Sequence, residues 1–245
     1  MVIERCAECA SNGPVPSGQR RWRRAFSLLE LLVVISVVVL LTGLLMPAMH
    51  HMRENAHRVI CMSHLQQLGQ AFHLYVANSH ERLPYSVVLH SDQAPQNLMV
   101  ARRAGPTGDW DGLGLLFLLE YCPAPECFYC PSHHGDHPFE RYADQWLHPP
   151  PNSVIYTNYH YAGDIEWNYT ARRRTLDDGY SLVLATDGLR TASDFNHFSG
   201  LNVLRGDGSV RWHNDTRDIL GHLPVTELQP VPNYSMIWEL VGGTH

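Results

Sequence analysis

The distribution of apolar residues divides the chain into four regions. Residues 1–25 show no hydrophobic periodicity, whereas the 19 residues from Leu31 to Met49 contain no charged side chain. As a helix, that stretch would span about 28 Å, close to the roughly 30 Å hydrocarbon core of a bilayer. Apolar residues then recur at spacings of three and four, and beyond residue 84 short apolar runs alternate with turns rich in Gly, Pro and Asn. The pattern predicts a leader over 1–25, a transmembrane helix over 26–49, an amphipathic stem helix over 50–83 and a globular head over 84–245.

The predicted stem has one apolar face. Its stripe is formed by residues spaced four, three, four and three apart, namely Cys61, Leu65, Leu68, Phe72 and Tyr75. Most of the polar residues between them fall on the other faces. We expect the stripe to pack against the head, and we expect the helix to end near Asn78-Ser79-His80, ahead of Leu83-Pro84.

The predicted head is mainly antiparallel sheet, which makes the fold class α+β. One helix is expected within 112–121, and the stretches around 90–110 and 131–150 are expected to be loops. The turn Gly206-Asp207-Gly208 predicts a hairpin near 201–212. The expected strands are Ser153–Tyr156, Ser181–Thr186, Leu201–Arg205, Ser209–Trp212 and Met236–Leu240.

Charge is distributed unevenly along the 245 residues, whose net charge is −6. All 18 basic residues are arginine; five of them lie in the first 25 residues, against two acids, so the leader is +3 and the remainder is −9. Arginine beside an apolar segment holds that end in the cytoplasm, so the head is expected to be exported. The apolar run is too long for a secretory signal and lacks a small-x-small cleavage site after it, so we expect it to stay attached. An acidic exported domain argues against a nucleic-acid partner.

The start of the apolar segment has a specific pattern. After the basic run and Ala25 comes Phe26-Ser27-Leu28-Leu29-Glu30, followed by leucine, valine and isoleucine. This resembles the N-terminus of type IV prepilins and type II secretion pseudopilins, in which a peptidase removes the leader ahead of the apolar segment. In that family the residue before the cleavage site is more often glycine than alanine. The resemblance implies a pilin-like fold, cleavage between Ala25 and Phe26 by a prepilin peptidase, and N-methylation of Phe26. It also implies that Glu30 neutralises the terminal ammonium of an adjacent subunit in a helix bundle, and that Pro47 is the helix-kinking proline.

A second resemblance lies in the head. His197, nine intervening residues and Asp207-Gly208 resemble the C-terminal signature of a prepilin-type family, and the segments Cys61–Gly69 and Phe128–Ser132 resemble elements of the same proteins. From the residues alone, Asp207-Gly208 forms a turn and His197 anchors the hairpin by hydrogen bonding. The other interpretation is a metal or carboxylate–imidazole site of His197, Asp207 and Asp187. Because no Ser or Cys nucleophile motif accompanies them, we expect no enzyme.

The cysteines allow two interpretations. Cys6 and Cys9 belong to the leader, and the four others form an even set that favours two disulfides in an oxidising compartment. We favour the pairs Cys61–Cys130 and Cys122–Cys127, although spacing alone permits three pairings. The alternative is a zinc site, because the segment after Cys122 is dense in metal ligands, of which the strongest are Cys127, Cys130, His133 and His137. No cofactor is otherwise expected.

These patterns predict a structural subunit of a type II secretion pseudopilus or type IV pilus-like assembly. Its expected partners are prepilin peptidase, like pilin or pseudopilin subunits and the bacterial inner membrane, with the N-terminus cytoplasmic and the head in the periplasm. One alternative is an extracytoplasmic binding or metal-binding domain on a pilin-type anchor. Another is a DNA-uptake pilin, for which the basic run 172–174 is the local feature.

Overall fold

The computed structural model describes residues 26–90, 98–105, 108–164, 174–197, 199–215, 218–224 and 234–242. It divides into two compact units, Met1–Ala48 and Met49–His245, which are described separately. The predicted leader, including Ala25, lies outside the described residues. The fold is α+β, with a long N-terminal helix followed by antiparallel sheets.

Within the first unit, α1 (Leu28–Asn78) begins after a serine cap. The Ser27 hydroxyl oxygen accepts the Leu29 N–H at 3.3 Å, which satisfies one of the free amides at the helix start. The apolar side chains from Leu28 to Met46 are exposed, and the hydroxyls of Ser36 and Thr42 donate to carbonyl oxygens of their own helix. By length and composition, this helix could cross a membrane. Pro47 lies within α1 near the boundary of the two units.

In the second unit, the stem is the part of α1 from Met49 to Asn78. Four residues of its predicted stripe are completely buried: Cys61, Leu65, Leu68 and Phe72. Tyr75 is half-buried and packs edge-on against Tyr121. After Asn78 the backbone turns away through left-handed conformations at His80 and Glu81. The helix therefore ends at the polar segment where the sequence predicts its end.

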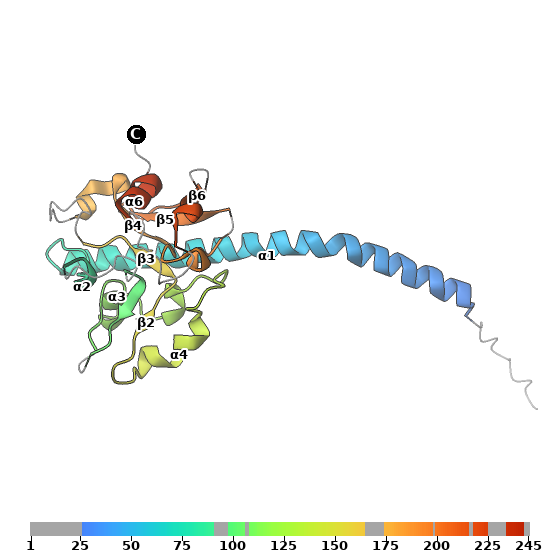
Figure 1. Ribbon diagram of the computed structural model, residues 1–245, viewed down its shortest axis with the longest axis horizontal. Coiled ribbons are helices and arrows are strands. Elements are labelled where there is room, and N and C mark those ends of the chain that lie inside the picture. The colour runs from blue at the N-terminus through green and yellow to red at the C-terminus, as the bar shows by residue number, and fades with distance from the viewer. Residues whose placement is uncertain are drawn as a thin grey trace, which may run out of the picture. The chain divides into compact units, whose positions relative to one another are not determined.

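The main sheet of the second unit has four antiparallel strands in the order β3-β4-β5-β6 (Figure 1). Its strands are β3 (Tyr159–Tyr161), β4 (Val183–Asp187), β5 (Gly200–Arg205) and β6 (Val210–Asn214). β5 and β6 form a hairpin in which Leu204 pairs with Val210.

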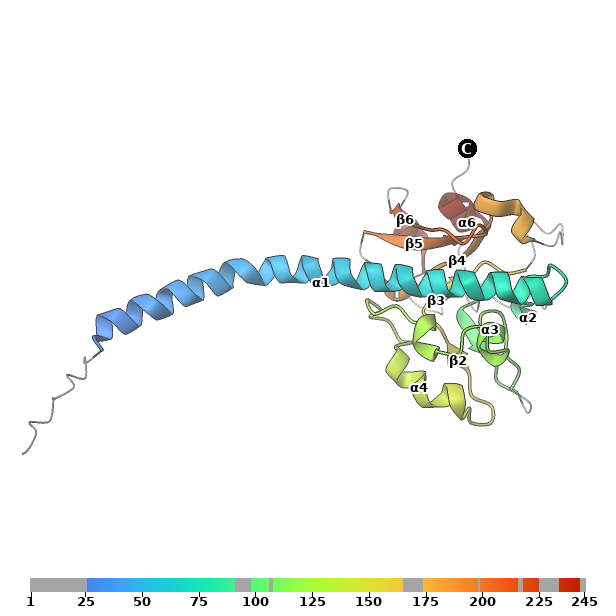
Figure 2. The same cartoon turned by 180° about the vertical axis from the view of Figure 1, so that it is seen from behind.

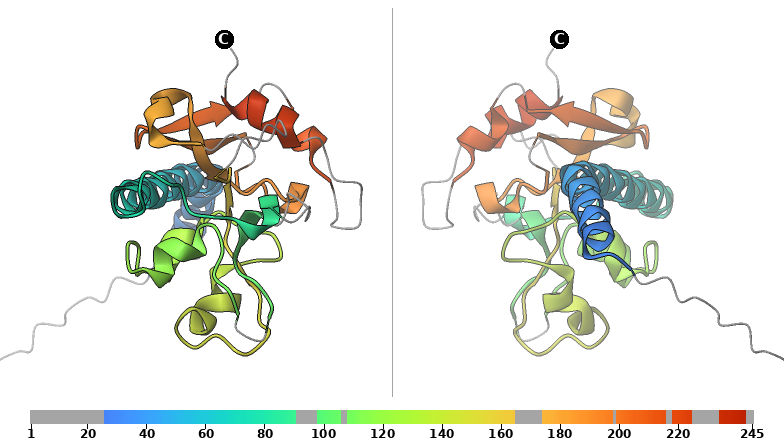
Figure 3. Two further views of the ribbon diagram at one scale, coloured as in Figure 1. Left: turned by 90° about the vertical axis from the view of Figure 1, so that its left-hand side faces the viewer. Right: turned by 90° about the vertical axis from the view of Figure 1, so that its right-hand side faces the viewer.

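The two faces of this sheet bury different partners. One face packs on the stem, in a cluster that includes Leu68, Tyr159, Leu184 and Leu204. The other face, with Val183, Leu201 and Val203, packs against α5 (Ile219–His222) and α6 (Tyr234–Gly242). Figure 3 shows the sheet between the stem and α6. The stem is thus part of the core of this unit.

A second group of elements covers another side of the stem (Figure 2). It contains the ribbon of β1 (Val100–Arg102) and β2 (Ile155–Tyr156), with α3 (Gly114–Leu118) and α4 (Phe139–Leu147). Leu116 of α3 and Trp146 of α4 belong to the same buried cluster as the stem stripe. The remaining described elements are short: α2 (Val87–His90) and the 3-10 helices η2 (Pro125–Phe128), η3 (Leu176–Ser181) and η4 (Ala192–Asp194).

Three predictions about local structure are wrong. The run Met236–Leu240, predicted as a strand, is part of α6, and Ile237 and Val241 are buried at a helical spacing of four. The predicted loop 131–150 contains α4, whose buried residues Tyr142 and Trp146 have the same spacing. The predicted loop 90–110 contains β1, which is stabilised by pairing with β2 from a distant part of the chain.

Candidate functional site

Four chemically reactive side chains meet in the core of the second unit. They come from four segments: Cys61 from the stem, Cys130 from the residues after η2, Asp187 from the end of β4, and His197 from the loop between η4 and β5. All four are buried, and the atoms they offer as ligands lie within 4.8 Å of one another. We call this set the Cys–His–Asp cluster.

The contacts within the cluster are polar. The Cys61 thiol donates to Asp187 Oδ1 at 2.8 Å. Cys130 Sγ lies 3.5 Å from His197 Nε2, and the same nitrogen lies 3.8 Å from Asp187 Oδ2. Both sulfurs therefore face an acidic or imidazole partner.

A second layer of hydrogen bonds orients the cluster. His197 Nδ1 lies 2.5 Å from Glu54 Oε1 on the stem, and the other oxygen of Glu54 accepts from the Ser132 hydroxyl at 2.8 Å. On Asp187, Oδ2 accepts the Asn202 N–H at 2.5 Å and Oδ1 lies 3.4 Å from the Asn196 amide nitrogen. Two of the three cluster residues from the head, Asp187 and His197, are thus held by groups outside the cluster.

The stem residues that contact the cluster and its neighbours are spaced so that they lie on one face of α1. Glu54, Arg58 and Cys61 follow one another at four and three residues, which continues the apolar stripe toward the N-terminus. The Arg58 guanidinium carbon lies 3.3 Å from the centre of the Trp212 ring on β6, a cation–π contact. Trp212 in turn packs edge-on against His197. The same face of α1 therefore positions both the apolar core and the cluster.

Burial and hydrogen bonding shift the acidities in opposite directions. Burial raises the pKa of the Cys61 thiol well above its ordinary value, and burial also raises the pKa of Asp187 against the opposing effect of His197. At Cys130 burial acts upward, but hydrogen bonds with Cys61 and His197 prevail and lower the thiol pKa. Burial also disfavours the His197 imidazolium, yet Cys130, Asp187 and Glu54 together raise its pKa to about 9. Within the cluster, the pKa of Cys130 is thus shifted toward the thiolate, whereas the pKa of Cys61 is shifted away from it.

The structure brings together the two cysteine pairs that the sequence analysis favours. Cys61 and Cys130 are neighbours within the cluster, and the side chains of Cys122 and Cys127 are close enough to shift the pKa of each other. All four are free and buried here. The two disulfides therefore stay predictions with adjacent partners.

The alternative zinc ligands Cys127, Cys130, His133 and His137 are not brought together. The Cys127 thiol donates to Gln67 Oε1 at 3.0 Å, and His133 Nδ1 lies 2.7 Å from Asn196 Oδ1. His137 has its own environment: Nδ1 lies 2.8 Å from the Tyr142 hydroxyl, and Arg190 contacts Nε2. Of these four, only Cys130 belongs to the cluster.

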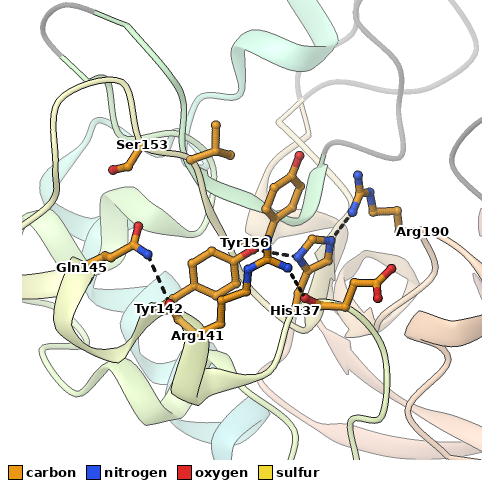
Figure 4. Close-up of a pocket in the computed structure, with 9 residues that line it drawn as sticks. His137, Arg141, Tyr142, Gln145, Ser153, Tyr156 and Arg190 are labelled. Atoms are coloured by element: carbon orange, nitrogen blue, oxygen red, sulfur yellow. Dashed lines mark hydrogen bonds between the residues drawn. The ribbon is translucent and has the colours of Figure 1, made fainter.

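His137 and Arg190 line a surface pocket of about 440 Å³. Figure 4 shows the His137 ring between Arg190 and Tyr142, with Gln145 and Ser153 at the rim. Burial, followed by the charge of Arg190, lowers the pKa of His137 to about 3. The imidazole is therefore neutral at physiological pH.

The Asp207-Gly208 pair of the signature lies in the β5–β6 turn, whereas His197 is in the cluster. Asp207 is exposed, and its Oδ1 accepts the Ser209 N–H at 2.9 Å. Interaction with the Ser209 side chain, followed by this backbone contact, lowers the Asp207 pKa. Gly208 has φ of +81°, a conformation that glycine adopts without strain. The carboxylates next to His197 are those of Glu54 and Asp187, and Asp207 is not among them.

The residues of the predicted processing site are only partly described. Ala25 lies outside the described residues, and Phe26 is 71 % exposed. Glu30 lies in the first turn of α1, where a carboxylate interacts favourably with the helix dipole, and it is exposed.

Glu54, Asn196 and Asn202 were missed by the sequence analysis. The signal for Glu54 was present, since the spacing of the stem stripe extends to it. The two asparagines carry no such signal, because their contacts with Asp187 follow from the tertiary fold. No protein-family model, no curated protein and no solved structure matches the chain.

Proposed function

We propose that this chain is a membrane-anchored, prepilin-like structural subunit that assembles through its N-terminal helix. The observation that carries the proposal is the difference in side-chain exposure between the two parts of α1. Its first part, from Leu28 to Met46, exposes mostly apolar side chains with one carboxylate, Glu30, while one face of its stem is buried in the head. A helix with an unpartnered apolar surface requires either lipid or other helices around it.

The motif at the start of the helix favours a pilus-type subunit among membrane-anchored proteins. The order of basic run, Ala25, Phe26 and Glu30 resembles a prepilin processing site, and cleavage there leaves Phe26 as the first residue and Glu30 as the fifth. A carboxylate in an apolar helix bundle is costly unless it is paired. The new terminal ammonium of a neighbouring subunit is the partner that processing supplies. The head then lies on the exported side of the inner membrane, and a pseudopilus or a type IV pilus-like filament is the assembly that we propose.

The role of Glu30 can be tested in cells that express the full-length chain together with a prepilin peptidase. We expect Glu30→Ala to insert and to be processed, but to lose the crosslinks between subunits that the wild-type chain forms in the membrane. Ser36→Ala is a matched control, because Ser36 is a polar residue of the same segment whose hydroxyl donates to the Val33 carbonyl oxygen of its own helix.

Equal crosslinking of Glu30→Ala and the wild type would overturn the role of Glu30. A wild-type chain that remains monomeric in the presence of the peptidase would instead support the alternative, an anchored extracytoplasmic binding domain.

A further inference from the structure

We propose that the Cys–His–Asp cluster is a structural zinc site, with Cys61, Cys130, Asp187 and His197 as its four ligands. The proposal goes beyond the prepilin-like function and does not depend on it. It rests on the identity of the four ligand atoms, their spacing, their burial and the groups that hold them.

The ligand set matches the preferences of zinc. Two sulfurs, one imidazole nitrogen and one carboxylate oxygen form a four-coordinate set of the kind that binds Zn²⁺, and sulfur ligands disfavour Mg²⁺ and Ca²⁺. With ordinary bond lengths, a sulfur and a nitrogen on one tetrahedral zinc lie about 3.5 Å apart. Cys130 Sγ and His197 Nε2 are separated by 3.5 Å. The remaining ligand atoms lie within the 4.8 Å spread of the cluster.

The surroundings of His197 are those of a metal-binding histidine. A ligating imidazole usually donates its second ring N–H to a carboxylate, which sets the tautomer and orients the ring. Here Nδ1 lies 2.5 Å from Glu54 Oε1, and Nε2 points toward Cys130 and Asp187. Glu54 is itself held by Ser132. Glu54 is therefore a positioning residue for the site.

A disulfide between Cys61 and Cys130 is less compatible with the polar groups around the two sulfurs than a zinc ion is. Oxidation of Cys61 and Cys130 to an S–S bond would remove the thiol proton that Asp187 Oδ1 accepts at 2.8 Å. Asp187 is completely buried, and loss of a donor to a buried carboxylate is costly. A zinc ion would instead bind both sulfurs and the carboxylate at once, so that none of the four groups is left without a partner.

The site would join the stem to the head. Cys61 lies on α1, whereas the other three ligands come from separate segments of the head, 69, 126 and 136 residues further along the chain. All four coordination positions are filled by protein atoms, which is characteristic of structural zinc sites and leaves no open position for a substrate. We therefore assign the ion a structural role.

The test uses the full-length chain, purified in mild detergent with zinc present and then dialysed. Every sample carries Cys6→Ser and Cys9→Ser so that the leader cysteines do not contribute metal ligands. We expect one zinc per chain by elemental analysis, and after exchange we expect the visible spectrum of tetrahedral Co²⁺ with a sulfur-to-cobalt charge-transfer band. The variant Cys61→Ser/Cys130→Ser should lose the ion. The matched control, Cys122→Ser/Cys127→Ser, removes two buried cysteines outside the cluster and should retain it.

A milder variant keeps the proposal testable if loss of both cysteines prevents folding. Glu54→Gln leaves all four ligands in place but removes the carboxylate that contacts His197 Nδ1, so it should weaken zinc binding about 10–100-fold in competition with a chromophoric chelator. Glu140→Gln, an exposed change on α4, should leave the affinity unchanged.

Two results would overturn the zinc site. One is zinc retained at one per chain by Cys61→Ser/Cys130→Ser. The other is a chain with all four cluster residues intact that holds no zinc, whether mass spectrometry finds Cys61 and Cys130 as free thiols or joined by a disulfide. Equal zinc affinity of Glu54→Gln and the wild type would overturn the role assigned to Glu54.

Discussion

Replacing one stem residue should destabilise the head as strongly as a core mutation does. Leu68 is completely buried in the cluster that contains Leu204 and Trp146, so Leu68→Ala should lower the free energy of unfolding by about 2–5 kcal/mol. Leu74 lies six residues further along the same helix and is 54 % exposed. Leu74→Ala should therefore change stability by less than about 0.5 kcal/mol.

Urea unfolding of the full-length chain in mild detergent measures both variants. Trp146 lies in the same buried cluster as Leu68, so tryptophan fluorescence reports on the region that the substitution affects. With an m value of about 2 kcal/mol per molar urea, a loss of about 3 kcal/mol lowers the midpoint by about 1.5 M. Equal midpoints for the two variants would refute the conclusion that the stem is part of the core of the head.

Three further predictions use the same unfolding assay. Gly208→Ala should cost about 1–2 kcal/mol because alanine is strained at φ of +81°, whereas Asp207→Asn should cost less than about 0.5 kcal/mol; a reversed order would contradict the assignment of this pair to a turn. Gly114→Ala should destabilise the head by more than about 2 kcal/mol, because its Cβ would lie 1.9 Å from the Ala101 carbonyl oxygen. Gly43→Ala should not lower the midpoint, because the added Cβ would meet no atom within 4 Å beyond its own stretch of helix and alanine is the better helix former; a wild-type midpoint for Gly114→Ala would refute this packing. His137 has its pKa lowered to about 3 in the folded state, so it stays neutral there while the unfolded chain takes up a proton below its pKa of about 6.5. The contribution of neutral His137 to the free energy of unfolding is therefore complete above about pH 6.5 and is lost as the pH falls toward 3, by about 1.4 kcal/mol per pH unit. Between pH 7 and pH 5, His137→Gln should lose less stability than the wild type does. Equal losses would contradict the neutral state of His137.

The helix and its buried face could be predicted from the sequence because they depend on local periodicity. The spacing from Cys61 to Phe72 identifies the buried face of the stem, and the polar segment at Asn78 marks its end. Helix α6 could not be separated from a strand in the same way, since Met236–Leu240, with four apolar or aromatic residues and one glutamate, is too short a run to tell the two periods apart. Helix α4 was missed because only two of its residues, Tyr142 and Trp146, are buried.

The candidate site could be predicted only in part. The sequence favours Cys61 and Cys130 as a cysteine pair. It also allows a metal or carboxylate–imidazole site that contains His197 and Asp187. Their meeting in one cluster depends on how the stem lies against β4 and β5, which no local pattern encodes. The same holds for Asp207, which is close to His197 in the signature but lies in an exposed turn.

The central claim, that this chain is processed and assembled as a prepilin-like subunit, is tested most directly by mass spectrometry of its N-terminus. The full-length chain is expressed in bacteria with an active prepilin peptidase and, separately, with a catalytically inactive one. We predict a mature chain beginning with N-methylated Phe26 in the first case and an uncleaved chain in the second. An uncleaved chain beginning at Met1 in the presence of the active peptidase would contradict the claim.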